Sequence, residues 1–128
     1  MKIRNTFIVV MMVLACLFVT TAEAQQYTVT KVVAIAKPNT YAGPCPATIE
    51  FVGTIFVSRP ARVEYRWERS DGAMGPRESV DISSAGKGVT TTWQVGTPHR
   101  SFNGWEKLHV LAPNSISSNE AAVQIKCN

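Results

Sequence analysis

Histidine and cysteine are scarce in this sequence of 128 residues, which contains two of the former and three of the latter. None of them stand at the spacings that metal sites use, so the pattern predicts neither a metal centre nor another cofactor. Basic residues outnumber acidic ones by 13 to 9, but they are scattered singly and form no runs. Nucleic-acid-binding proteins usually present a basic patch or stripe, so this class of function is disfavoured.

The motifs of common enzyme sites are also missing. No Gly-x-Ser-x-Gly segment marks a nucleophile, and the glycines at 72 and 75 lack the following Lys-Ser/Thr of a phosphate loop. Glu64 and Glu68 share one face of a strand, but about 13 Å separates such positions, which is too far for a glycosidase pair. His99 and His109 stand at no spacing that favours a Ser–His–Asp group. We therefore expect a protein that is not an enzyme.

Residues 1–24 have the features of a secretory signal peptide. Lys2 and Arg4 precede a short apolar run over residues 7–19, and Ala22-Glu23-Ala24 supplies the small-x-small pattern of a cleavage site. The apolar run is too short to span a bilayer. We therefore expect an exported protein, secreted or periplasmic, whose single domain covers residues 25–128.

A lipid anchor at Cys16 is an alternative, because residues 13–16 resemble a bacterial lipobox. The apolar run continues past Cys16 through residues 17–19, whereas a lipoprotein usually begins with a polar tether. The sequence therefore favours ordinary cleavage over lipidation.

The clearest strand pattern lies at residues 63–68. Val63, Tyr65 and Trp67 alternate with charged residues, which is typical of a strand with one buried and one wet face. Asp71-Gly72 then predicts a turn. This stretch is predicted to run through the centre of the core. The predicted core residues are Phe51, Tyr65, Trp67 and Trp93.

Similar patterns predict seven strands with no helix between them. Turn-forming residues recur every eight to fifteen positions, and neither an internal repeat nor a low-complexity segment is present. Short strands at this spacing favour an all-β fold, a seven-stranded antiparallel immunoglobulin-like β-sandwich. The predicted strands cover residues 25–36, 47–57, 63–68, 77–82, 89–95, 105–111 and 121–127.

One disulfide is predicted between Cys45 and Cys127, the two cysteines that remain after signal cleavage. An even pair in an exported chain favours a disulfide. If the strands alternate in direction, Cys45 before the second strand and Cys127 at the end of the seventh lie at the same pole. The strand count and the cysteine pair therefore agree.

Three segments carry a resemblance to a known class of domain. Residues 41–55, residues 65–72, and Trp105 with Ala112-Pro113-Asn114 resemble bacterial secreted immunoglobulin-like or fibronectin-III-like domains. The resemblance covers nearly all of residues 25–128 and implies an exported β-sandwich, but no activity. Antibody-type domains differ, because their disulfide joins two strands across the core and the predicted sixth strand here has no cysteine.

The predicted strand directions also gather a set of loops at the pole of the disulfide. Sandwich domains commonly bind through loops at one end, and Arg with exposed aromatic residues is typical of interface hot spots. The candidate binding residues at this pole are Tyr41, Arg69, Asp71, Arg77, His99, Arg100 and Phe102, with Met74 beside them.

These observations predict an exported, non-enzymatic binding or adhesion module. Its expected partner is a protein or a glycan on a cell surface or in the envelope. Two alternatives stay open: a protein that acts through an exposed strand edge, for which the first and fourth predicted strands are candidates, and a secreted enzyme with an unrecognised site.

Overall fold

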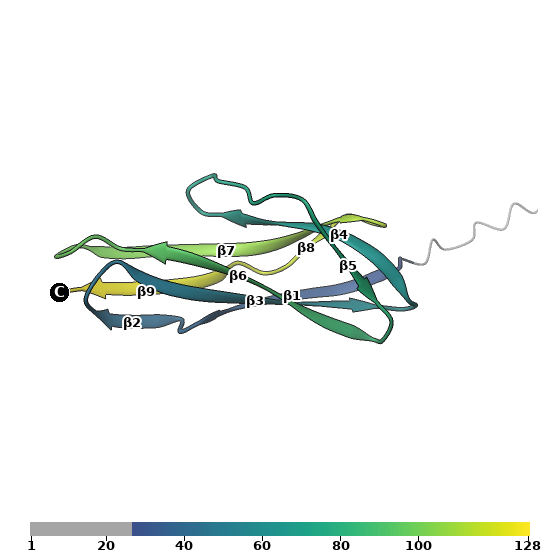
Figure 1. Ribbon diagram of the computed structural model, residues 1–128, viewed down its shortest axis with the longest axis horizontal. Helices are drawn as coiled ribbons and strands as arrows, with labels where there is room; N and C mark the ends of the chain where they lie inside the picture. The colour runs from purple at the N-terminus through teal and green to yellow at the C-terminus, as the bar shows by residue number, and fades with distance from the viewer. Residues whose placement is uncertain (1–26) are drawn as a thin grey trace, which may run out of the picture.

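The computed structural model describes residues 27–128, which form two packed β-sheets (Figure 1). The predicted signal peptide and Cys16 lie outside these residues. The described part of the chain contains strands and no helix, and hence no helix that could cross a membrane. The strands are β1 (Val29–Lys37), β2 (Thr40–Gly43), β3 (Ala47–Val57), β4 (Ala61–Arg69), β5 (Glu78–Ile82), β6 (Gly86–Val95), β7 (Ser101–Ala112), β8 (Ile116–Ser117) and β9 (Ala121–Cys127).

The topology confirms an all-β sandwich. One sheet has the order β1-β3-β6, and the other has the order β2-β9-β7-β4-β5 with β8 attached to β7. All pairs are antiparallel except β2 with β9, which is parallel. The strands β1 and β5, which correspond to the first and fourth predicted strands, lie at sheet edges.

The predicted number of seven strands is wrong, because the described residues form nine. Both additional strands are short and lie where Pro, Gly or Asn residues indicated loops. Strand β2 has four residues that pair with Gln124–Cys127, and β8 has two residues that pair with His109 and Val110. Strands of this length show too little alternation to stand out in a sequence. They form because a longer neighbour already presents free backbone groups.

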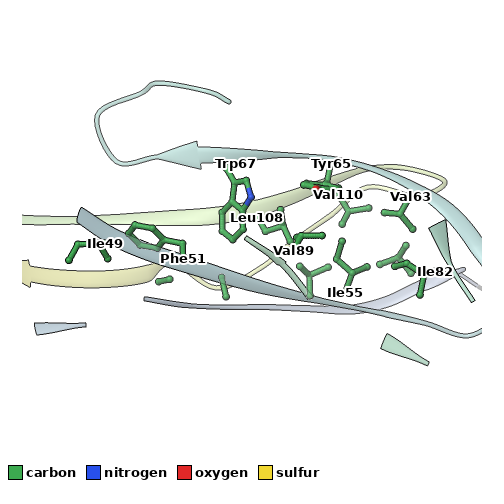
Figure 2. Packing of buried hydrophobic residues seen from close by; sticks show 14 of the residues in the cluster. Ile49, Phe51, Ile55, Val63, Tyr65, Trp67, Ile82, Val89, Leu108 and Val110 are labelled. Atoms are coloured by element: carbon green, nitrogen blue, oxygen red, sulfur yellow. The ribbon is translucent and has the colours of Figure 1, made fainter. Parts of the chain in front are cut away.

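The core lies between the two sheets (Figure 2). Val63, Tyr65 and Trp67 of β4 point across to residues of β3 such as Phe51. Of the predicted core residues, Phe51, Tyr65 and Trp67 are 0%, 7% and 4% exposed. Trp93 is half-buried and packs against the edge of this core.

Gly53 makes room for the largest core side chain. A Cβ atom at this position would lie 2.5 Å from Cδ2 of Leu108 and 3.1 Å from Cη2 of Trp67. The strand β3 pairs through Gly53 without a shift of register. The glycine in this strand therefore accommodates the Trp67 indole ring, and no bulge forms there.

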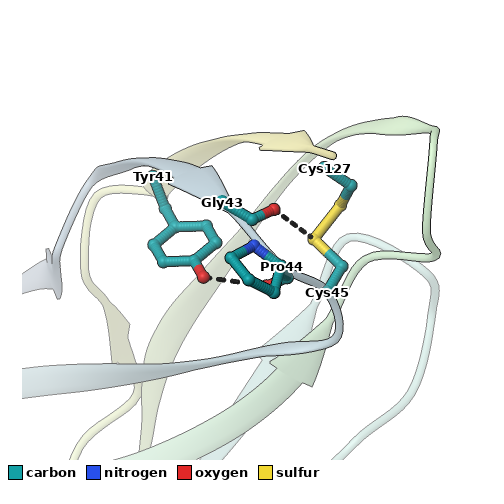
Figure 3. The surroundings of a disulfide bond; sticks show 5 residues. All are labelled: Tyr41, Gly43, Pro44, Cys45 and Cys127. Atoms are coloured by element: carbon teal, nitrogen blue, oxygen red, sulfur yellow. Dashed lines mark hydrogen bonds between the residues drawn. A yellow bond between two sulfur atoms is a disulfide. The ribbon is translucent and has the colours of Figure 1, made fainter.

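The predicted disulfide is confirmed. Cys45 and Cys127 are bonded, with their Cα atoms 5.4 Å apart (Figure 3). Cys45 directly precedes β3 of the three-stranded sheet, whereas Cys127 ends β9 of the larger one. The bond therefore ties the two sheets together at one end of the sandwich, which we call the disulfide end.

Candidate functional site

The structure does not gather all the predicted binding residues at the disulfide end. Tyr41, His99 and Arg100 lie there. The Tyr41 hydroxyl donates to the Pro44 carbonyl at 2.8 Å (Figure 3). The His99 amide donates to the carbonyl of Asn128. Both contacts are internal to the fold. Tyr41 is half-buried, and His99 and Arg100 are exposed.

Arg77 lies far from the disulfide end. Its guanidinium group pairs with Glu64 at 3.4 Å, and Glu64 lies beside Ala112 at the opposite end of β7 from Ser101. Eleven residues of extended strand separate Ser101 from Ala112, which corresponds to about 36 Å. Arg77 therefore does not belong to the cluster that was expected at the disulfide end.

The reason is the path of the loop between β4 and β5. Strand β7 runs beyond the end of β4, because Arg69 pairs with Glu106 and residues 101–105 pair only with β9. The loop does not follow β7 outward. It folds back along β4, where the Gly75 amide donates to the Trp67 carbonyl at 2.8 Å (Figure 1).

Arg69 and Asp71 of the predicted set form an ion pair. Two hydrogen bonds join the guanidinium group to the carboxylate, from Nη2 to Oδ2 at 2.6 Å and from Nε to Oδ1 at 3.2 Å. The hydrogen bond from Arg69 holds the pKa of Asp71 below its ordinary value. The same guanidinium group lies 4.5 Å from the ring centre of Trp93 on the other sheet, and Phe102 meets Trp93 edge-on at 5.4 Å.

Beside Arg69 lies a residue that the sequence analysis did not select, Glu106. It pairs with Arg69 in the β4–β7 ladder, and its side chain points inward with those of Leu108 and Val110. Glu106 is only 3% exposed, and its Oε2 atom has no hydrogen-bond partner among the described residues. The inward parity that it shares with Leu108 and Val110 was the signal available in the sequence.

The charge of Glu106 is suppressed mainly by burial. Burial raises the pKa of this carboxyl group to about 7, while the positive charge of Arg69 lowers it and the negative charge of Asp71 raises it further. A carboxyl group without a partner is costly to bury, and most buried polar groups in native proteins have one. A buried Glu106 without a partner among the described residues is therefore unusual.

Glu106 lines a cleft of about 170 Å³ between β4, the β4–β5 loop and β6. We call it the Glu106 cleft. Its walls include Trp67, whose Nε1 atom also lacks a hydrogen-bond partner among residues 27–128. Two residues that each hold a buried polar atom without a partner among the described residues thus line the same cleft. The remaining lining residues are Arg69, residues 73–76 of the loop, Glu78, and Thr90–Thr92 of β6.

The raised pKa of Glu106 predicts that stability falls as pH rises from about 4.5 to about 7. In this window the unfolded chain has lost the proton that the folded protein still holds, so folding binds a proton and weakens with pH. The loss is expected to reach about 3 kcal/mol at pH 8. Glu106→Gln should remove this loss of stability. Urea unfolding at pH 5 and pH 8 measures the loss in the wild type and in the variant. The exposed Glu50→Gln is the control, and an equal loss in both variants would contradict the assignment.

Comparison with known proteins supports the architecture. Neither a protein-family model nor a curated protein sequence matches the chain. Among solved structures, the CARDB domain of a Pyrococcus furiosus protein, crystallised in complex with di-metal ions, has a TM-score of 0.52. The match covers 81% of this chain and 100% of that one, at 14% identity. The similarity shows the fold alone.

A second match is to an alkylpurine DNA glycosylase from Pseudomonas fluorescens, bound to DNA containing an abasic site analog. Its TM-score is 0.46 at 13% identity, and the match covers 76% of this chain and 30% of that one. Within residues 27–128, no group of three or more His, Cys, Asp or Glu residues is placed to hold a metal ion.

A hydrogen-bonded chain of three residues lies on the outer face of the larger sheet. Oε1 of Glu68 lies 3.0 Å from Nδ1 of His109, and Nε2 of His109 lies 3.0 Å from Oγ of Ser115. Burial raises the pKa of Glu68, but His109 and Lys107 outweigh it and leave this pKa below its ordinary value. The sequence could not indicate this chain, because β4 and β7 bring together residues 41 positions apart.

Proposed function

We infer that the protein is an exported, non-enzymatic binding module whose partner places a hydrogen-bond donor or a cation in the Glu106 cleft. The observation that carries this proposal is the buried carboxyl group without a partner. Its desolvation reduces stability, and a ligand that supplies the missing partner recovers that loss. Trp67, whose indole NH also lacks a partner among the described residues, lines the same cleft.

Export is part of this proposal. The predicted signal peptide over residues 1–24 would direct the chain out of the cytoplasm, to the periplasm or the medium. The Cys45–Cys127 disulfide supports this location, because disulfides persist mainly in oxidising compartments. Among the expected protein or glycan partners, the Glu106 cleft favours those that present a hydrogen-bond donor or a cationic group. Action through the edge strands β1 and β5 stays a prediction.

The test is whether a molecule from the native surroundings of the protein stays bound in the cleft. The exported protein is incubated with periplasmic extract or culture medium, separated by gel filtration and examined by native mass spectrometry. We expect a bound species with the wild type. Thr91→Trp, which fills the cleft from β6, should abolish it. Thr48→Trp, on the exposed outer face of β3, should leave it unchanged. A bound species that survives Thr91→Trp would contradict the proposal.

A second candidate function is ester hydrolysis at Ser115, favoured by the chain of Glu68, His109 and Ser115. In this arrangement His109 takes the Ser115 proton as the hydroxyl oxygen attacks an ester carbonyl, and Glu68 holds the imidazole in position. The alcohol leaves with the proton returned by His109, and water then hydrolyses the acyl–Ser115 ester to release the acid. Ser115 also lines a groove of about 490 Å³ between the start of β1 and the β7–β8 turn, with Tyr27, Val29 and Ile116 among its walls. An apolar acyl chain fits such a groove.

If Ser115 is a nucleophile, a fluorophosphonate probe should label it. Peptide mass spectrometry locates the label, which should disappear in Ser115→Ala and persist in Ser117→Ala, the exposed serine of β8. His109→Gln should slow labelling by about 100-fold or more, because the general base is lost. Absence of labelling in the folded wild-type protein would remove this candidate.

A further inference from the structure

We propose that two copies of this chain associate through the free edge of β6, so that their three-stranded sheets join into one continuous sheet. The proposal concerns an interaction surface and goes beyond the function inferred for the Glu106 cleft. Three observations carry it: the unused backbone groups of β6, the protection of the other sheet edges, and the match between β6 and an antiparallel copy of itself.

Every second residue of β6 directs its backbone groups away from its own sheet. The Val57 amide donates to the Ala85 carbonyl at 2.8 Å, so these two opposite residues form a hydrogen-bonded pair. Hydrogen-bonded and non-bonded pairs alternate along an antiparallel ladder, and β3 and β6 pair without a shift of register. The odd-numbered residues of β6 therefore bond to β3. The residues that direct their amide and carbonyl groups outward are Gly88, Thr90, Thr92 and Gln94.

The other neighbour of β3 supports this assignment. Gly53 of β3 lies opposite Val89 on one side and opposite Ala34 of β1 on the other. Because Gly53 bonds to β6, Ala34 is expected to direct its backbone groups away from β3. Its amide and carbonyl groups indeed both bond to the Asn119 side chain, each at 2.9 Å.

The outward backbone groups of β6 have no partner among residues 27–128. The three-stranded sheet ends at β6, and no hydrogen bond within the described part of the chain reaches the backbone of the four outward residues. All four residues are exposed. A row of unpaired amide and carbonyl groups is a template on which another strand can pair.

The other sheet edges are protected or short. On β1, the Asn114 and Asn119 side chains each bond to both backbone groups of one residue. Strand β2 has four residues, and β5 has five, of which Glu78 and Asp81 are acidic. Charged side chains discourage pairing at an edge. Strand β6 instead offers ten residues, with Lys87 as its single charged residue.

The outward residues of β6 match an antiparallel copy of the strand when the two-fold axis passes beside Thr91. Thr90 then lies opposite Thr92 of the second copy. Gly88 lies opposite Gln94 of the second copy. Only outward residues meet in these pairs, so each pair exchanges two backbone hydrogen bonds. Threonine pairs across neighbouring strands are also favourable.

The charge on β6 is compatible with this self-pairing. Lys87 lies opposite Val95 of the second copy in the same register, so no like charges meet across the axis. The two-fold relation forms each favourable contact twice, whereas a foreign strand has to supply a matching sequence of its own. A second copy of the chain is therefore the favoured occupant of this edge.

Sedimentation velocity of the exported, oxidised protein from about 50 µM to about 1 mM tests the proposal, because small interfaces dissociate in this range. We expect the wild type to form dimers as its concentration rises. Thr92→Pro should weaken dimerisation about tenfold or more, because each copy loses one outward amide. The variant keeps the hydrogen bonds to β3, and edge strands tolerate proline. Thr92→Val keeps the amide and should leave the dimer in place.

Amide hydrogen exchange of the wild type, measured by NMR, gives a second readout that needs no variant. The amides of Thr90, Thr92 and Gln94 should exchange rapidly in the dilute sample and slowly in the concentrated one. The Thr91 amide, which bonds to β3, should be protected in both. Exchange of the three outward amides that stays rapid at every concentration would contradict the proposal.

Two further results would overturn the proposal. One is a wild type that stays monomeric over the whole range, which would leave the β6 edge free for a foreign strand. The other is a dimer that forms unchanged in Thr92→Pro, since the contact would then lie on another surface. Circular dichroism shows that the proline variant is folded before the comparison is made.

Discussion

Replacing Cys45 and Cys127 with alanine is expected to lower the free energy of unfolding by about 4–5 kcal/mol. The disulfide closes a loop over 82 positions, and the cross-link removes conformational entropy from the unfolded chain. Small domains are stable by only about 5–15 kcal/mol, so the double variant should be close to unfolding at 37 °C. Urea unfolding of the oxidised wild type and the variant measures the difference.

The position of this bond strengthens the expectation. It joins the end of β9 to the start of β3, and so adds a cross-link between the two sheets beside the β2–β3 and β6–β7 connections. Gly96 lies against it, since a Cβ atom there would be 2.7 Å from Sγ of Cys127. A loss of less than about 1 kcal/mol in the double variant would show that the unfolded chain gains little freedom when the bond is absent.

Trp67→Ala is expected to destabilise the domain by about 3–5 kcal/mol, because it removes the largest side chain at the centre of the core. Trp67 is 4% exposed, and β3 carries a glycine at position 53 to accommodate its ring. Chemical denaturation monitored by circular dichroism measures the change.

Trp67→Phe is the matched variant for this position. It keeps an aromatic ring in the core and removes the indole NH, which has no partner among the described residues. Its loss of stability should therefore be much smaller than that of Trp67→Ala. Equal stability of the wild type and Trp67→Ala would contradict the packing described for the core.

The sequence predicted the fold where long alternating strands dominate. Strands β3 and β9 begin and end where the alternation predicted, because one face of each is apolar throughout. The pairing of Cys45 with Cys127 followed from the number of cysteines left after signal cleavage, agreed with the predicted strand directions, and is confirmed. The short strands β2 and β8 could not be predicted, since their formation depends on edges that only the folded sheets provide.

The binding surface was harder to predict than the fold. Strand directions alone indicated that Arg69 and Arg77 would join Tyr41 at one pole. The lengths of β4 and β7 differ, and the β4–β5 loop returns along β4, so Arg77 lies far from Tyr41. Glu106 was hidden by the mixed parity of β7, where Trp105 and Leu111 are also large and apolar.

The central claim is that the Glu106 carboxyl group is buried without a hydrogen-bond partner among the described residues. Carbon-13 NMR of the Glu106 carboxyl group, titrated from pH 4 to pH 9, tests this claim most directly. We predict a pKa of about 7, because burial disfavours the ionised form. A pKa near the ordinary value of 4.5 would contradict the account.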